Sequence, residues 1–113
     1  MTPLEKIAIL RSIGFQIRVG HFRPIKGADP KILLSRTAVR EALILDGIKY
    51  EFLATGGMTE VEIGWEGETI GGGLAICSKK DNFCYKTGLA YALDRAVFST
   101  VVTIGNVTRG QMR

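Results

Sequence analysis

The chain has 113 residues, 46% hydrophobic and 23% charged, with a net charge of +4 at pH 7. This length predicts one domain whose core buries roughly two-thirds of the surface of the unfolded chain, and the near-average composition excludes a largely disordered protein. No apolar run approaches the ~20 residues of a membrane span, and the N-terminus lacks the basic start and cleavage site of a signal peptide, so we expect a cytoplasmic protein.

The charge is segregated along the chain. Residues 1–40 carry eight Lys or Arg against two acids, residues 41–78 one against seven, and residues 79–113 six against two. If the two basic ends meet in the fold, they form a surface that attracts anions. The acidic middle disfavours indiscriminate binding to nucleic acid.

The cysteines and the single histidine form no recognisable metal motif. Cys77 and Cys84 are seven positions apart, which matches no common zinc spacing, and His21 alone does not complete a four-ligand site. We therefore expect no metal, no cofactor and two reduced thiols, a disulfide being the alternative that a cytosolic setting disfavours. His21 is expected to be a surface or hydrogen-bonding residue.

The N-terminal third predicts a helix, a strand and a loop. Thr2 is a favoured N-cap with Pro3 behind it, and an amphipathic helix follows until Gly14. Residues 15–21 alternate apolar and polar as in a half-buried strand, and the Pro-bounded residues 24–30 are expected to form a loop.

A second helix is predicted from a cap at Ser35 to about Leu45, after a brief strand at residues 31–34. Arg36 and Arg40 lie four positions apart on its polar face without acids one turn earlier. They are therefore available for anions, unless the face is simply solvated.

Three strands are predicted next, as an antiparallel meander. They cover residues 48–52, 59–65 and 74–77, with turns at Gly56, Gly57 and Gly67. Alternation places glutamates on a solvated face and Trp65 in the core or at an interface.

The longest helix is predicted to follow the Gly-rich stretch TIGGGLAICSKKDNF of residues 69–83. Ser78 is a favoured N-cap and Asp81 lies three positions later, so the helix should run from Ser78 to about residue 98. Lysines would then surround the positive end of the helix dipole, which favours a phosphate-bearing ligand: Lys79, Lys80 and Lys86. The alternative is a solvated helix end whose lysines provide solubility.

This helix should pack on the sheet, with Gly88 as a notch for close approach. The β-branched run from Val101 to Val107 predicts a final strand at a sheet edge or a subunit interface, so we expect a homo-oligomer with Arg109 and Arg113 at that junction. Together these elements predict an α+β fold, a single domain over residues 1–113 with a small antiparallel sheet packed by N-terminal and C-terminal helices.

Residues 35–98, read as helix, three strands and helix with a lysine cluster opening the last helix, resemble a double-stranded-RNA-binding domain. That resemblance implies a nucleic-acid-binding module. The third lysine of the usual cluster is replaced by Asn82 or Phe83, and five glutamates lie within residues 51–68.

A second resemblance covers about half the chain. The strand GG-x-T-x-V-x-I at residues 56–63, the helix opening A-x-C-S-x-K-D-x-F at residues 75–83 and the ending A-x-x-R-A at residues 92–96 are similar to a group of small phage proteins that contains the Thoeris anti-defence 1 protein. The resemblance implies a viral anti-defence protein, acting in the cytoplasm of an infected bacterial host. It would be a homo-oligomeric sponge that sequesters a cyclic ADP-ribose isomer and so evades antiviral immunity without catalysis.

The expected ligand-binding residues combine one aromatic ring with nearby polar and basic groups. Phe83 is the aromatic that the resemblance places near the ligand, with Arg109 and Arg113 as anion contacts. The helix opening adds Lys79, Lys80 and Asn82. No catalytic residue is expected, because Ser78 and Thr87 have no histidine tied to them by spacing.

Overall fold

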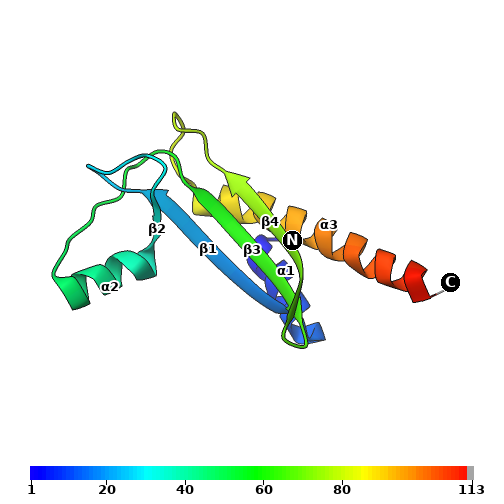
Figure 1. Cartoon of the computed structure of the whole chain (residues 1–113). Helices are drawn as coiled ribbons and strands as arrows, with labels where there is room; N and C mark the ends of the chain where they lie inside the picture. The colour runs from blue at the N-terminus through cyan, green and yellow to red at the C-terminus, as the bar shows by residue number, and fades with distance from the viewer. Residues whose placement is uncertain (112–113) are drawn as a thin grey trace.

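The chain folds into a four-stranded antiparallel sheet with helices at both ends of the sequence (Figure 1). This computed structural model describes residues 1–111, with side chains placed through residue 106. In chain order the elements are α1 (Pro3–Ile13), β1 (Gln16–Pro24), β2 (Leu33–Ser35), α2 (Arg36–Asp46), β3 (Met58–Trp65), β4 (Glu68–Ile76) and α3 (Tyr85–Gln111). The strands lie in the order β2-β1-β3-β4. The predicted α+β class is confirmed.

Local signals place the first two helices as predicted. Thr2 Oγ1 accepts a hydrogen bond from the Glu5 amide and the Glu5 carboxylate accepts one from the Thr2 amide, both at 3.2 Å, so a capping box opens α1. Ser35 Oγ accepts from the Ala38 amide at 3.1 Å and opens α2. α2 lies beyond the β1 side of the sheet and buries none of its residues (Figure 1).

The core lies between the sheet and the two terminal helices, on one face of the sheet (Figure 1). Alternate side chains of β3 face this side, and Val61 and Ile63 are at most 1% exposed. Ile7 of α1 joins them, and α3 contributes three fully buried residues at the predicted helical spacing: Ala92, Leu93 and Ala96. Trp65, at the end of β3, is 39% exposed, so it borders the core rather than filling it.

Glycines allow α3 to lie directly on the strands. A Cβ added at Gly73 of β4 would lie 2.5 Å from the Ala96 amide nitrogen, so no larger residue fits there without displacing the helix. Gly88 of α3 faces Thr59, whose side chain fills the predicted notch. A strand therefore presses against Gly88.

β4 is an edge strand, and α3 covers part of its free edge. The Arg95 guanidinium donates to the Leu74 carbonyl oxygen, and the Gly72 amide donates to Ser99 Oγ at 3.4 Å. Two outward backbone groups of β4 are thus paired within the chain.

The predicted strand at residues 48–52 is wrong. This segment is a loop that makes one bridge, between Ile25 and Phe52, while β1 is already paired by β2 on one side and β3 on the other. β2 pairs with β1 only at Phe22, Arg23 and Pro24, and residues 48–52 add no ladder along the rest of that edge. Residues 35–98 therefore contain helix, two strands and helix, one strand fewer than the order on which the RNA-binding resemblance depends.

The predicted final strand at residues 101–107 is also wrong, because α3 continues through this segment to Gln111. The Thr100 and Thr103 hydroxyls donate to the carbonyl oxygens of Ala96 and Ser99, at 2.9 and 3.0 Å, so these residues satisfy their polar groups inside the helix. The nearest sheet edge is the one that α3 itself covers. Along the described residues, no helix combines the length and the apolarity that crossing a bilayer requires.

Candidate functional site

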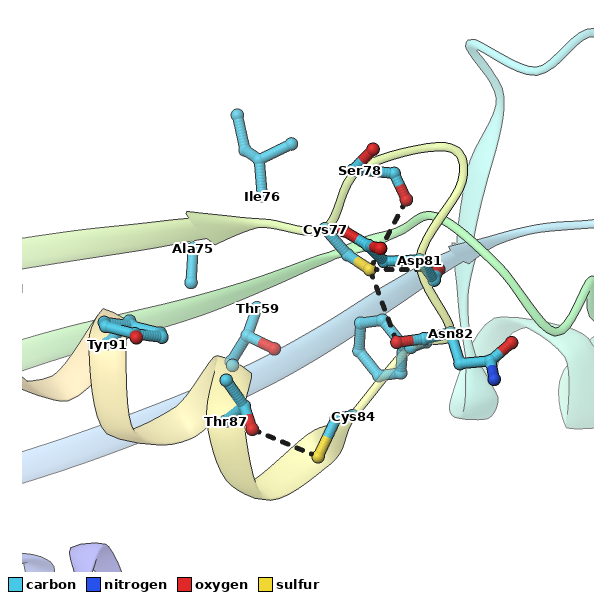
Figure 2. A pocket seen from close by; sticks show the side chains of 12 residues that line it. Thr59, Ala75, Ile76, Cys77, Ser78, Asp81, Asn82, Cys84, Thr87 and Tyr91 are labelled. Atoms are coloured by element: carbon cyan, nitrogen blue, oxygen red, sulfur yellow. Dashed lines mark hydrogen bonds between the residues drawn. The ribbon is translucent and has the colours of Figure 1, made fainter.

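The loop between β4 and α3 forms one wall of a cavity of about 220 Å³ (Figure 2). The loop is held against residues 54–57 by three backbone hydrogen bonds, from the Cys77 amide to the Gly57 oxygen, from Gly56 to Asp81 and from Phe83 to Ala54, at 2.8–3.1 Å. The residues that line the cavity come from β3, β4, the loop and the first turns of α3: Thr59, Ala75, Ile76, Cys77, Ser78, Asp81, Asn82, Phe83, Cys84, Thr87, Gly88 and Tyr91.

The predicted helix start at Ser78 is wrong by about two turns. Ser78 instead closes a turn, because its carbonyl oxygen accepts from the Asp81 amide at 3.0 Å and its hydroxyl from the Lys80 amide at 3.3 Å. The Phe83 amide and the Asp81 carbonyl oxygen, which a helix would have used, are instead bonded to Ala54 and Gly56. The Gly88 amide donates to the Cys84 oxygen at 2.9 Å, which makes Cys84 the residue that opens α3.

The predicted site residues are therefore not all brought together. Phe83 and Asn82 line the cavity of Figure 2, whereas Lys80 is exposed in the turn and Lys79 borders a separate apolar hollow. Neither lysine lies at the helix N-terminus, so the dipole argument does not apply to them. Arg109 belongs to the end of α3, but its side chain and the whole of Arg113 lie outside the described residues.

Phe83 packs among polar and aromatic side chains rather than in the apolar core. It is half-buried, and its ring makes edge contacts with the rings of His21 and Tyr85, with centroids 5.9 and 4.8 Å apart. Across this cluster from the first cavity lies a cleft of about 380 Å³ between β1 and the start of α2. Its lining residues are Val19, Gly20, His21, Arg23, Ser35, Arg36, Thr37, Phe52 and Tyr85.

Arg23 is the central group of this cleft. Its guanidinium carbon lies 5.0, 5.3 and 5.9 Å from the ring centroids of Phe52, Phe83 and Tyr85. It donates to the Leu53 carbonyl oxygen at 2.6 Å and to the Tyr85 hydroxyl at 3.1 Å. Its Nε is buried and has no hydrogen-bond partner in the described structure. Three aromatic rings and two acceptors thus fix the position of a cation that no carboxylate of the described residues neutralises.

Arg36 adds a second cation at the first position of α2, with its guanidinium carbon 5.7 Å from the Tyr85 ring centroid. Within the described part of the chain, neither Arg36 nor Arg23 forms an ion pair with an acid, and no Asp or Glu lines the cleft. Arg36 and Thr37 are also the first residues of α2, whose amides have no acceptor inside the helix. Positive charge and free donors therefore converge on one cleft.

The titratable groups of the cleft respond to this charge. Burial and the charge of Arg36 lower the pKa of His21 below its usual 6.5, so His21 is neutral at pH 7. Burial opposes ionisation of Tyr85, but its polar contacts with Arg23 and Arg36 and their charges outweigh burial and lower its pKa. Both shifts have the direction expected beside a surplus of positive charge.

His21 is paired with a buried hydroxyl. His21 Nδ1 is hydrogen-bonded to Thr59 Oγ1 at 2.9 Å, which would suit a base and a nucleophile, but Thr59 is 0% exposed and faces Gly88. The hydrogen-bonding role expected for His21 is thus the one observed. No group of His, Cys, Asp and Glu among residues 1–111 is arranged to hold a metal ion.

A scan against protein-family models, a search of curated proteins and a search of solved structures each found no match for this chain. The arginine cleft was not predicted from the sequence. Its signal was the alternation of Ile17, Val19 and His21, which, continued by one step, places Arg23 on the same face of β1 as His21.

Proposed function

We propose that this protein binds a small phosphate-bearing nucleotide and holds it without changing it chemically. The observation that supports this proposal most directly is the cleft in which Arg23 and Arg36 lie without acidic partners. Guanidinium groups bind phosphate oxygens through paired, charge-assisted hydrogen bonds. The amides that open α2 add donors of the kind that phosphates accept.

The cleft also has the size and the aromatic surface that a nucleotide needs. Its volume of about 380 Å³ lies within the range of small-molecule sites. Phe52 and Tyr85 line it, and stacking of a base on an aromatic ring contributes about 1–3 kcal/mol. With a few charge-assisted hydrogen bonds of about 1.5–3 kcal/mol each, this is sufficient for micromolar or tighter binding after association costs.

The resemblance to phage anti-defence proteins suggests the ligand and the biological role. We propose a cyclic ADP-ribose isomer as ligand, sequestered by a homo-oligomer in the cytoplasm of an infected bacterial host. In this arrangement Phe83 does not contact the ligand itself. It positions the side chains of the cleft through its contacts with His21, Arg23 and Tyr85. The pyrophosphate of such a ligand would bind to Arg23 and Arg36.

The test is retention of a cyclic ADP-ribose isomer on the purified protein, followed by removal of free ligand, heat denaturation and chromatography of what is released. Arg36→Gln should weaken binding by about 10-fold or more, because one charge-assisted interaction of about 1.5–3 kcal/mol is lost. Arg40→Gln is the matched control, since Arg40 is exposed one turn later on α2 and does not line the cleft.

Ligand released intact, with binding sensitive to Arg36→Gln and not to Arg40→Gln, supports sequestration at the cleft. A chemically altered product would identify an enzyme and overturn the proposal. No retention would also overturn it, and binding of duplex RNA with a steep salt dependence would then favour the nucleic-acid-binding alternative.

A further inference from the structure

The C-terminal part of α3 projects past the sheet (Figure 1). Several of its apolar side chains are exposed. Residues 96–107 include no Asp, Glu, Lys or Arg. Exposed side chains recur on the side opposite the buried Ala92 and Ala96, and we call them the α3 stripe: Phe98 (70% exposed), Val101 (62%) and Val102 (44%). Their spacing of three and one positions places them on one side of the helix.

This part of α3 is poorly suited to stand alone as a helix. Six of the nine residues 97–105 are Val, Ile or Thr, and the last is Gly105. β-Branched residues cost up to about 0.7 kcal/mol each in a helix relative to Ala, and Gly costs about 1 kcal/mol. Such a segment is helical only when packing stabilises it. Within residues 97–106 the chain buries only Thr100, at 6% exposed, and packs Val97 partly against the core. Residues 101–106 are all exposed, so a packing partner for them must come from elsewhere.

The single chain exposes more surface than a compact monomer of its mass, which leaves enough area for an interface with a second copy. Its accessible area is 8052 Å², about 2,000 Å² more than is usual for a folded monomer of this mass. Its radius of gyration is 16.7 Å, whereas a compact domain of this length has about 13 Å. A stable interface of standard size buries about 800 Å² on each partner, well within this excess.

We propose that two copies of this chain associate through their α3 stripes, and that the projecting part of α3 is stabilised by this contact. An uncharged stripe complements itself, because neither copy must desolvate an unpaired charge, which favours a two-fold interface between identical surfaces. This inference names a surface for the homo-oligomer proposed above. It does not depend on nucleotide binding, which involves the opposite end of α3.

The test compares oligomeric state and helix content of the full chain and two variants, by light scattering after gel filtration and by far-ultraviolet circular dichroism. Phe98→Glu places a charge in the stripe and should raise the dimer dissociation constant at least about 100-fold, since a central aromatic anchor typically contributes 2 kcal/mol or more and the added charge is desolvated. Leu4→Glu is the control, because Leu4 is equally exposed (71%) but lies on α1.

We expect a dimer for the parent chain and for Leu4→Glu, and a monomer with lower helix content for Phe98→Glu. Trp65 fluorescence, which reports the packing of Trp65 against Phe15 at a centroid distance of 5.0 Å, should remain unchanged and show that the body of the protein is folded. A parent chain that is monomeric at about 100 µM, or a dimer that survives Phe98→Glu, overturns the proposal. Retention of the cyclic ADP-ribose isomer is measured on the same samples, so that failure of the dimer proposal and failure of the nucleotide proposal are seen separately.

Discussion

The close contact between α3 and β4 predicts a large effect of a single methyl group at Gly73. In Gly73→Ala the new Cβ would lie 2.5 Å from the Ala96 amide nitrogen and 2.9 Å from Arg95 Cβ, and closest of all to the Ala92 carbonyl oxygen. The atoms of Ala92 and Ala96 belong to the helix backbone, so they do not move away by a side-chain rotation. The whole helix must shift, although Ala92 and Ala96 are fully buried.

Overpacking of this kind costs about 1–3 kcal/mol. Replacing glycine by alanine lowers the entropy of the unfolded chain and returns about 0.4–1 kcal/mol. We therefore expect Gly73→Ala to lower the free energy of unfolding by about 1–2 kcal/mol. This corresponds to a Tm roughly 5–15 °C lower for a domain of this size. The shift also displaces Tyr85 at the start of α3, so it should weaken ligand binding as well.

Gly72→Ala is the matched control, because its Cβ would meet only the Val61 carbonyl oxygen, at an ordinary 3.7 Å. We expect it to be neutral or slightly stabilising. Urea and thermal unfolding of both variants measure the difference. Equal stabilities for Gly73→Ala and Gly72→Ala would show that α3 does not rest on β4 as described.

Three further predictions follow from individual residues. Burial lowers the pKa of His21, so the unfolded chain takes up a proton there more readily than the folded chain does. The free energy of unfolding should therefore fall as the pH drops below 6.5. Urea unfolding of the parent chain and of His21→Gln should show a smaller fall in the variant. Hydrogen bonds from Thr87 lower the pKa of the Cys84 thiol. Alkylation at neutral pH, followed by mass spectrometry, should therefore be faster at Cys84 than at Cys77. In Thr87→Val the alkylation of Cys84 should be slower. Glu66 has a φ of 50° beside Gly67 in the β3–β4 turn, so Glu66→Asn should stabilise the fold by up to about 1 kcal/mol in thermal unfolding.

The features that the sequence predicts well are those determined by neighbouring residues. The Thr2 cap, the Ser35 cap and the Gly67 turn each depend on a few adjacent positions, and all three are observed. The buried face of α3 and the inward side of β3 follow from periodicity, because each faces a single core.

The errors arise where distant residues decide the local structure. Ser78 has the residues around it that open a helix, but hydrogen bonds between its loop and residues 54–57 hold that loop in a turn, and such pairing leaves no trace in the local sequence. Residues 101–107 have the composition of a strand, yet α3 covers the edge that a strand would join. In both places tertiary contacts override local propensity.

The candidate site was predicted only in part for a similar reason. Phe83 is predicted to lie near the ligand, which stays a prediction: its ring contacts Arg23 at 5.3 Å but lines the neighbouring cavity rather than the arginine cleft. Arg23 and Arg36 come from β1 and α2, and only the fold brings them to the same side of Tyr85. The predicted lysines lie in the neighbouring loop instead.

The hydrogen bonds from α3 to the rim of β4 have a consequence for the behaviour of the protein at high concentration. Arg95 and Ser99 hydrogen-bond to the Leu74 carbonyl oxygen and the Gly72 amide, backbone groups to which an incoming peptide strand would otherwise bind. Addition of a strand at this part of the β4 edge would require both bonds to break before any new one formed. Arg95→Ala should therefore leave the fold intact but lower solubility, visible as turbidity on concentration.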